Sequence, residues 1–126
     1  MLDNSEVVMK LLSGWEEVHK MGQLTLWTML SLKESPKPMA DIKKFMITMT
    51  NGTIDPEDQS LYRSLRKYCK AGLIDYKEIS SKSGPKKKSY FLTKTGIDVV
   101  SLFIERNITD IYFKDTVVAL LSRKEN

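Results

Sequence analysis

The sequence contains only one cysteine, Cys69, and one histidine, His19, among its 126 residues. A single cysteine excludes an internal disulfide framework, and the two residues together are too few for the three or four ligands of an ordinary zinc site. His19 falls in a predicted amphipathic helix and lacks the carboxylate or serine motif that catalysis by histidine requires. We therefore expect a protein that is not an enzyme and that uses no cofactor.

Long hydrophobic runs are also missing. No apolar stretch approaches the roughly 20 residues needed to span a bilayer, and the acidic start of the chain lacks the basic region of a signal peptide. We therefore expect no membrane partner and a cytoplasmic location. The composition, 41% hydrophobic and 29% charged, is that of an ordinary globular protein, and 126 residues are enough for one hydrophobic core.

Residues 55–72 carry the start and stop signals of a helix. Asp55 is a predicted N-cap, Pro56 fits the first helical position, and Gly72 follows the last turn. Apolar side chains recur at helical spacing on one face, and polar and basic side chains occupy the other. The predicted apolar face contains Leu61, Leu65, Tyr68 and Cys69, and the other face contains Gln59, Arg63, Arg66, Lys67 and Lys70.

A basic hairpin is predicted to follow this helix. Residues 73–79 and 89–93 are rich in β-branched and aromatic side chains, and residues 80–85 between them have turn chemistry. The predicted tip carries Lys82, Lys86, Lys87 and Lys88 beside Gly84 and Pro85. A helix followed by a hairpin with a cationic tip is typical of a winged-helix DNA-binding domain.

The positive charge of the chain is segregated in this region. Residues 59–96 contain 10 lysines and arginines but only two acidic residues, a net charge of +8. Because the whole chain has a net charge of +4, the remaining residues sum to −4. A solvated basic face is the alternative interpretation, but helix and hairpin both contribute, which favours a surface that meets phosphates.

The rest of the chain is predicted to be helical. Asn4 or Ser5 is expected to cap a first helix that ends near residue 20, and a buried helix is expected over residues 23–32. Residues 39–49 favour a helix closed by Asn51 and Gly52, although a hairpin over residues 47–54 is an alternative. After the wing, one helix is expected from residue 95 to 104 and another helical stretch over 111–121. Residues 107–110 either separate these two helices or join them into one.

The segment from residue 60 to 96 resembles the PadR-like transcriptional regulators. The resemblance rests on Leu61-Tyr62-Arg63-Ser64-Leu65, on Gly72-Leu73-Ile74, and on a Gly-Pro-basic wing that ends in Tyr90-Phe91-Leu92-Thr93 with Gly96 three residues on. It extends from Gly22 to about Phe103 and implies a dimeric winged-helix repressor that binds an inverted-repeat operator. Apolar-faced helices beyond the winged-helix core also favour a homodimer, with half-sites about 10 bp apart or a multiple of it.

The predicted fold is mainly α with a small two-stranded β-wing, an α+β winged helix-turn-helix with one or more C-terminal dimerisation helices. We expect an N-terminal accessory helix over residues 1–21, a winged-helix DNA-binding domain over 22–96 and a C-terminal helical dimerisation segment over 97–126. The expected partner is double-stranded DNA. The recognition helix is expected to present Gln59, Ser60, Tyr62, Arg63, Arg66 and Lys67 to bases or phosphates, and the wing to present Lys82, Lys86, Lys87 and Lys88.

Two alternative functions remain at this point: a non-specific architectural DNA-binding protein, or a winged helix that serves as a protein-interaction module. Cys69 is interpreted as a core residue, with a redox-sensing thiol as the alternative because lysines flank it. Asp55, Glu57 and Asp58 fit helix capping better than a cation site. Trp15 and Trp27 are interpreted as packing residues, and contact with a small hydrophobic effector is the alternative that the resemblance implies.

Overall fold

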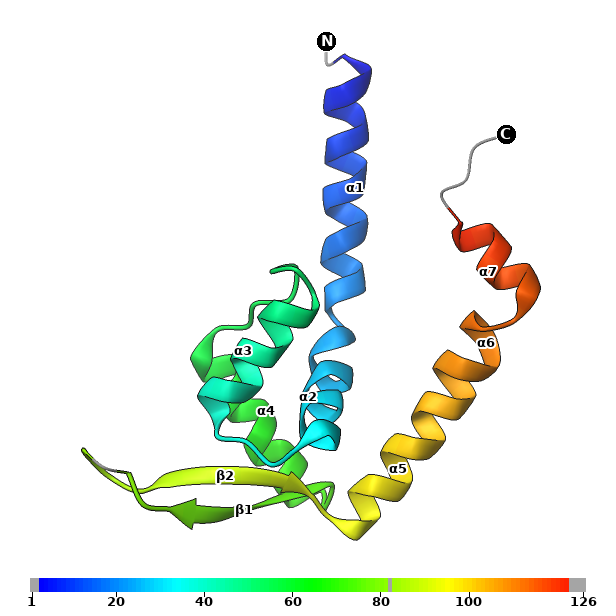
Figure 1. Ribbon diagram of the computed structural model, residues 1–126. Helices are drawn as coiled ribbons and strands as arrows, with labels where there is room; N and C mark the ends of the chain where they lie inside the picture. Colours follow the sequence, from blue (N-terminus) through cyan, green and yellow to red (C-terminus); the bar gives the residue numbers. More distant parts are fainter. Residues whose placement is uncertain (1–2, 82, 123–126) are drawn as a thin grey trace.

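The computed structural model describes residues 3–81 and 83–122 as a helical body with a β-hairpin on one side and two helical arms (Figure 1). One arm is α1 and the other runs from α5 to α7, and both point away from the hairpin. The elements are α1 (Asn4–Lys20), α2 (Gln23–Glu34), α3 (Met39–Met49), α4 (Asp58–Lys70), β1 (Ile74–Ile79), β2 (Lys87–Leu92), α5 (Lys94–Ile104), a π-helix (Glu105–Thr109), α6 (Asp110–Tyr112) and α7 (Asp115–Leu121).

A single hydrophobic core joins α2, α3, α4 and the root of the hairpin. Each helix contributes its apolar stripe, and the phenol of Tyr68 pairs with the Thr25 hydroxyl at 2.6 Å. This arrangement confirms the predicted winged helix, with helices at 23–32 and 39–49. The buried hydrophobic side chains are Met29, Leu32, Ile42, Met46, Ile54, Leu61, Leu65, Tyr68, Ile74, Tyr90 and Val100.

The alternative hairpin over residues 47–54 is wrong. Asn51 and Gly52 both adopt positive φ angles, of 53° and 79°, directly after α3. The amide of Gly52 donates to the Ile47 carbonyl at 2.8 Å, which satisfies one of the carbonyls that a helix end leaves free. The same two residue types that favour a hairpin turn therefore terminate a helix here, because their shared property is tolerance of the left-handed conformation.

Two predicted helix starts need correction. The N-cap of α4 is Glu57, not Asp55, and the helix begins at Asp58, two residues later than predicted. Lys43 of α3 lies beside this helix start, with its ammonium 2.9 Å from the Asp58 carboxylate and 3.9 Å from that of Asp55. At α1 the cap is Asp3, whose carboxylate accepts from the Glu6 amide at 2.9 Å, not Asn4 or Ser5.

The first helix has no buried residue within the chain. Its apolar positions, predicted to lie on one face, remain exposed, and the side chain of Trp15 is 76% exposed. Trp15 therefore does not pack inside the single chain, contrary to its predicted role, whereas Trp27 of α2 is half-buried against the core.

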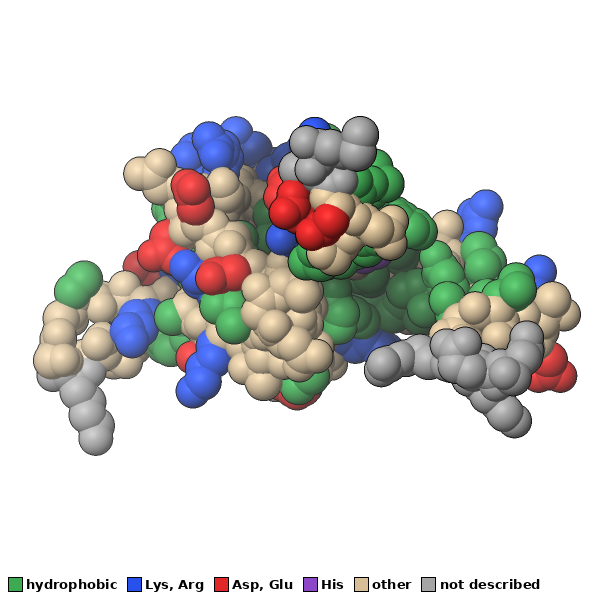
Figure 2. Space-filling model, turned by 90° about the horizontal axis from the view of Figure 1, so that it is seen from above, with side chains coloured by type: hydrophobic (Ala, Val, Ile, Leu, Met, Phe, Trp, Pro, Cys, Tyr) green, Lys and Arg blue, Asp and Glu red, His purple; other side chains and the backbone are tan. Residues whose placement is uncertain are grey.

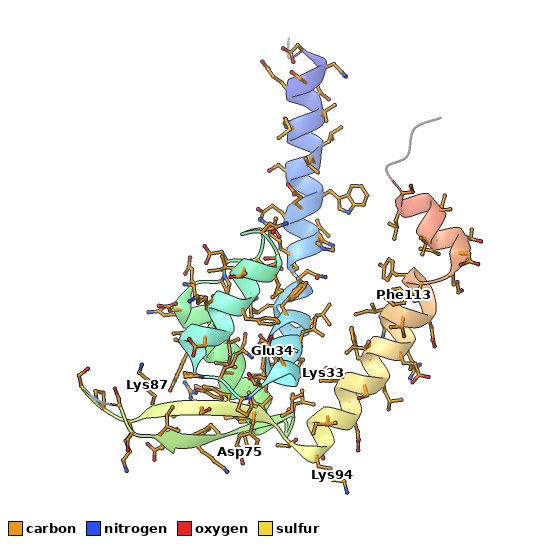
Figure 3. The ribbon with its side chains drawn as sticks, in the orientation of Figure 1. Lys33, Glu34, Asp75, Lys87, Lys94 and Phe113 are labelled. Atoms are coloured by element: carbon orange, nitrogen blue, oxygen red, sulfur yellow. The ribbon has the colours of Figure 1, made fainter. Side chains whose placement is uncertain are left out.

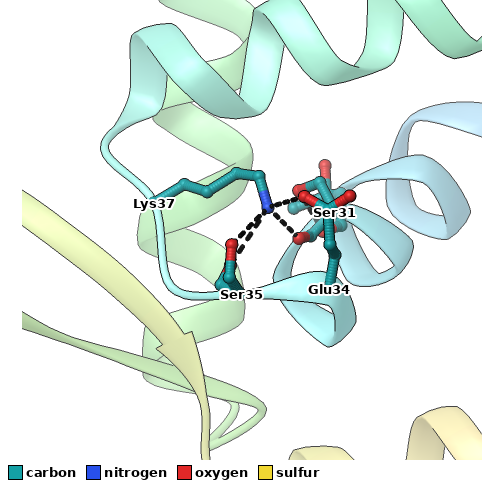
Figure 4. Close-up of polar contacts among 5 residues, drawn as sticks. Ser31, Glu34, Ser35 and Lys37 are labelled. Carbon is teal, nitrogen blue, oxygen red and sulfur yellow. Dashed lines mark hydrogen bonds and ion pairs between the residues drawn. The ribbon is translucent and has the colours of Figure 1, made fainter.

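The hairpin pairs β1 with β2 in an antiparallel register that runs from Ile74 opposite Leu92 to Ile79 opposite Lys87. Lys37, in the connection between α2 and α3, adds a short bridge to the second strand, exchanging backbone hydrogen bonds with Tyr90 at 2.8 and 3.0 Å. Its side chain is 10% exposed, and the ammonium donates to the Ser31 carbonyl at 2.6 Å and pairs with Glu34 at 2.8 Å (Figure 4). Lys37 therefore ties the end of α2 to the wing.

The C-terminal arm is continuous through residues 107–110, a point that the sequence left open. The chain passes them as the π-helix and the start of α6, and the side-chain amide of Asn107 donates to the Phe103 carbonyl at 3.1 Å. The chain turns only at Phe113 and Lys114, before α7. At the other end of this arm, the Thr93 hydroxyl caps α5 by accepting from the Gly96 amide at 3.0 Å. None of the helices within residues 3–81 and 83–122 is both long and apolar enough to cross a bilayer.

Candidate nucleic-acid interface

The outward face of α4 presents the polar side chains predicted for a recognition helix. Leu61, Leu65 and Tyr68 are buried beneath it, which fixes the rotation of the helix about its axis. Gln59, Arg63, Arg66 and Lys67 are exposed, the Tyr62 side chain is 41% exposed, and Ser60 is half-buried. Five of the six predicted helix positions therefore face solvent, and Ser60 lies at the edge of that face.

A groove of about 330 Å³ separates the start of α3 from the wing. Tyr62 of α4 lies on its wall, between Met39 on one side and Lys86 and Lys88 on the other. A second, shallower hollow of about 350 Å³ continues from Tyr62 and Met39 along α4, past Gln59, to Arg63 and Arg66. The two hollows share residues, so the helix face and the wing form one connected surface.

The lysines of the wing do not share one environment. Lys86 and Lys87 are exposed near the hairpin end, and both line the groove toward α3; Figure 3 shows Lys87 on the wing. Lys88 is half-buried, and its ammonium lies 4.5 Å from the ring centre of Tyr76 and 5.7 Å from that of Tyr62. Lys82 lies outside the described residues.

Two of the three acidic residues at the start of α4, Asp55 and Asp58, form ion pairs. The Lys43 ammonium sits between the carboxylates of Asp55 and Asp58, and these contacts raise the pKa of Lys43 through its hydrogen bond with Asp58. The pair joins α3 to α4 and offsets negative charge that would repel a phosphate near the helix N-terminus. The predicted capping by Asp55 is thus replaced by an ion pair between the two helices.

Cys69 is half-buried against the core, as its core interpretation requires. Burial raises the pKa of its thiol, and the nearby Asp75 carboxylate raises that pKa further. The opposing attraction comes from Lys88, not from the flanking Lys67 and Lys70. A raised pKa leaves less thiolate at neutral pH, which favours the core interpretation over the redox-sensing alternative.

Sequence reasoning missed three lysines with structural roles. Lys37 joins α2 to the wing through its backbone bridge to Tyr90, and Lys43 joins α3 to α4 through Asp58. No local motif predicts contacts between residues so far apart in sequence. The sequence did contain a signal for the position of the Lys88 side chain. Side chains in a strand alternate between faces, so Lys88 shares a face with Tyr90 and Leu92, whose place in the core the hydrophobic pattern indicates.

Comparison with known proteins agrees with this geometry. The family model described as the transcriptional regulator PadR-like family matches residues 29–101, which is more than half of the chain. None of the curated proteins matches the chain significantly.

Solved structures with the same fold include several described as PadR regulators. Bacillus subtilis PadR in complex with operator DNA has 20% sequence identity and a TM-score of 0.62, over 69% of this chain and 49% of that chain. A PadR family regulator from Eggerthella lenta DSM 2243 has 21% identity and a TM-score of 0.63, over 94% and 99% of the two chains. A PadR-like regulator from Bacillus cereus has 21% identity and a TM-score of 0.62, over 83% and 96%.

This chain spans about half the length of the Bacillus subtilis protein, but nearly the whole length of the other two. The region that matches the family model runs from the middle of α2, through α3, α4 and the wing, into α5. With a family model over residues 29–101 and the winged-helix fold in place, the chain belongs to the PadR-like family of transcriptional regulators.

Proposed function

We propose that this regulator is a repressor that binds an inverted-repeat operator as a homodimer. The connected cationic surface formed by α4 and the wing carries the proposal, because it offers base-reading and phosphate-contacting side chains together. In this proposal residues 22–96 bind DNA, residues 97–122 of the C-terminal segment dimerise with the help of α1, and repression follows when the bound dimer blocks the promoter.

The outward face of α4 is proposed to lie in the major groove. Arg63 is exposed near the middle of this face, and its guanidinium has the geometry for a bidentate contact with guanine. Gln59, Tyr62, Arg66 and Lys67 surround it and are proposed to contact bases or phosphates, with Ser60 at the edge. Lys86 and Lys87 of the wing are proposed to contact phosphates, which strengthens binding without reading sequence.

The second copy is proposed to cover the apolar faces of the two arms. Exposed hydrophobic side chains continue along α1 and from α5 to α7, and Figure 2 shows them gathered between α1 and the C-terminal arm. Faces of this extent are rarely left in water by a soluble protein. Two-fold symmetry pairs each face with a copy of itself and also places two α4 helices on a two-fold DNA site.

Selection from a random duplex pool, followed by binding to enriched and unenriched DNA at several salt concentrations, tests the DNA-binding proposal. We expect an inverted repeat to be enriched. Salt-dependent binding without enrichment would support the architectural alternative, and no binding to any duplex would support the protein-interaction alternative. Repression itself is tested with a reporter that carries the enriched site across its promoter.

Variants separate the proposed roles. Arg63→Ala should cost about 1–3 kcal/mol on the enriched site and much less on random DNA. Replacing Lys86 and Lys87 together by Ala should weaken binding to both DNAs and lower the dependence of log K on log salt concentration by roughly 0.9 for each phosphate that the variant no longer neutralises. Equal losses on both DNAs for Arg63→Ala would contradict its base-reading role.

Sedimentation tests the homodimer. Leu11→Arg places a charge on the apolar face of α1 and should convert the dimer to monomer. The control Glu17→Arg introduces the same side chain on the opposite face of the same helix and should leave the dimer intact. Wild-type protein that sediments as a monomer at micromolar concentration would refute this part of the proposal.

A small hydrophobic effector is proposed to bind against aromatic side chains in the dimer. Trp15 is the first candidate for this contact, because its side chain is exposed in the single chain. Titration with flat aromatic compounds should change tryptophan fluorescence in wild-type protein, and Trp15→Leu should abolish the response. An unchanged emission from both tryptophans across a broad panel would count against an effector.

A further inference from the structure

Lys88 lies in an aromatic cradle formed by Tyr62 of α4 and by Tyr76 and Tyr90 of the wing. Its ammonium is 4.5 Å from the ring centre of Tyr76 and 5.7 Å from that of Tyr62, both within the range of cation–π attraction. The rings of Tyr76 and Tyr90 are themselves in contact, with centres 5.8 Å apart and planes tilted by 55°. Lys88 is therefore the side chain through which the wing meets the exposed face of α4.

The hairpin register explains how this cradle forms. Tyr76 is paired with Tyr90, so the two side chains leave the sheet on the same face. Lys88 is two residues before Tyr90 and shares that face by the alternation of a strand. Tyr90 is buried in the core, which turns this face toward the helices and brings Lys88 against Tyr62.

Lys88 keeps its charge at neutral pH. Burial lowers the pKa of its ammonium, but the phenols of Tyr62, Tyr76 and Tyr90 outweigh that effect and raise the pKa above its ordinary value. Lys86 and Lys87, by contrast, are exposed. A phosphate that drew Lys88 out of the cradle would first have to break its interactions with the two rings.

We propose that Lys88 is a positioning residue that fixes the wing against Tyr62 of the recognition helix, in place of the phosphate contact expected from its sequence. The proposal rests on the proposed DNA-binding function. Fixing the wing in the free protein sets the distance between the groove-reading face of α4 and the phosphate-contacting lysines, so the surface meets DNA already in its bound geometry.

Salt-titrated binding to the enriched DNA distinguishes positioning from phosphate contact. Lys88→Met keeps the length and apolar stem of the side chain but removes its charge. Removing a positioning interaction can weaken binding by no more than that interaction is worth, about 2- to 5-fold for each ring at a partly exposed site. We expect a fall in affinity of this size with an unchanged salt dependence.

Three control variants show whether an effect of Lys88→Met comes from the loss of the cradle interaction. Lys87→Met, one residue away, should lower the dependence of log K on log salt concentration by roughly 0.9, as expected when one phosphate is no longer neutralised. Lys88→Arg keeps a cation over the rings and should restore affinity. Glu78→Gln tests the cross-strand neighbour of Lys88 and should not reproduce the weaker binding seen with Lys88→Met. A fall of about 0.9 for Lys88→Met, or an affinity equal to that of the wild type, would overturn the proposal.

A measurement on the free protein tests the cradle independently of DNA. Ring currents should shift the ε-methylene protons of Lys88 upfield of those of Lys86 and Lys87, and Tyr76→Leu should remove the shift. An unshifted Lys88 resonance in the wild-type protein would overturn the cradle. Wild-type protein that shows the shift but binds no duplex would refute the proposed function and leave the cradle supported.

Discussion

The joint between the wing and the C-terminal arm depends on the absence of a side chain at Gly96. Gly96 is buried in the first turn of α5, where its amide donates to the capping hydroxyl of Thr93. A Cβ atom built at this position lies far closer to the Leu73 carbonyl oxygen than van der Waals contact allows, and 2.9 Å from the Leu73 carbonyl carbon. That oxygen also accepts the Thr93 amide at 3.1 Å, so it cannot move without breaking the joint.

Gly96→Ala should therefore destabilise the protein. Overpacking of a well-packed site costs about 1–3 kcal/mol, and the upper end applies here because the obstructing atoms belong to the backbone. Alanine regains about 0.5–1 kcal/mol through its better helix propensity. The net loss of about 2 kcal/mol corresponds to a fall in Tm of about 6–10 °C for a chain of this size.

Thermal unfolding followed by circular dichroism, at one fixed protein concentration, measures this fall. Gly14→Ala is the matched control, because Gly14 lies within α1 and a Cβ there meets no atom within 4 Å. That substitution should raise Tm slightly through helix propensity alone. A Gly96→Ala variant as stable as the wild type or as Gly14→Ala would refute the close approach of α5 to Leu73.

Three further predictions concern single side chains. Lys37→Met should lower the free energy of unfolding by about 1–3 kcal/mol in urea titrations, because the Ser31 carbonyl loses its hydrogen bond from the Lys37 ammonium and keeps only the longer one, 3.4 Å, from the Ser35 amide. Lys33→Met on the exposed side of α2 should have little effect. Because the pKa of Cys69 is raised, iodoacetamide should modify the folded protein at pH 7 more slowly than the urea-unfolded chain, and equal rates would contradict the burial of the thiol. Trp15 emission should shift to the red on dilution through the dimer dissociation range, and a constant spectrum would argue against its burial by the second copy.

Local signals placed most elements correctly. The spacing of apolar residues predicted α2 and α3 with their ends nearly in place, and Gly72, with a φ of 83°, ends α4 as its sequence position suggested. These predictions worked because periodic burial and left-handed backbone positions are encoded within a few neighbouring residues. The start of α4 was predicted wrongly, in a segment where Lys43 of another helix lies beside Asp55 and Asp58 and the cap is Glu57.

The sequence by itself determined the class of this protein: one core, a helix with a basic face and a cationic hairpin, joined by motifs that resemble the PadR-like family. Only the tertiary structure decided which cations are free. Lys86 and Lys87 remain exposed, whereas Lys37 and Lys88 are taken up by interactions inside the molecule. The physical reason is that charge is a property of the residue, but its availability depends on the carbonyls, carboxylates and rings that surround the ammonium once the chain has folded.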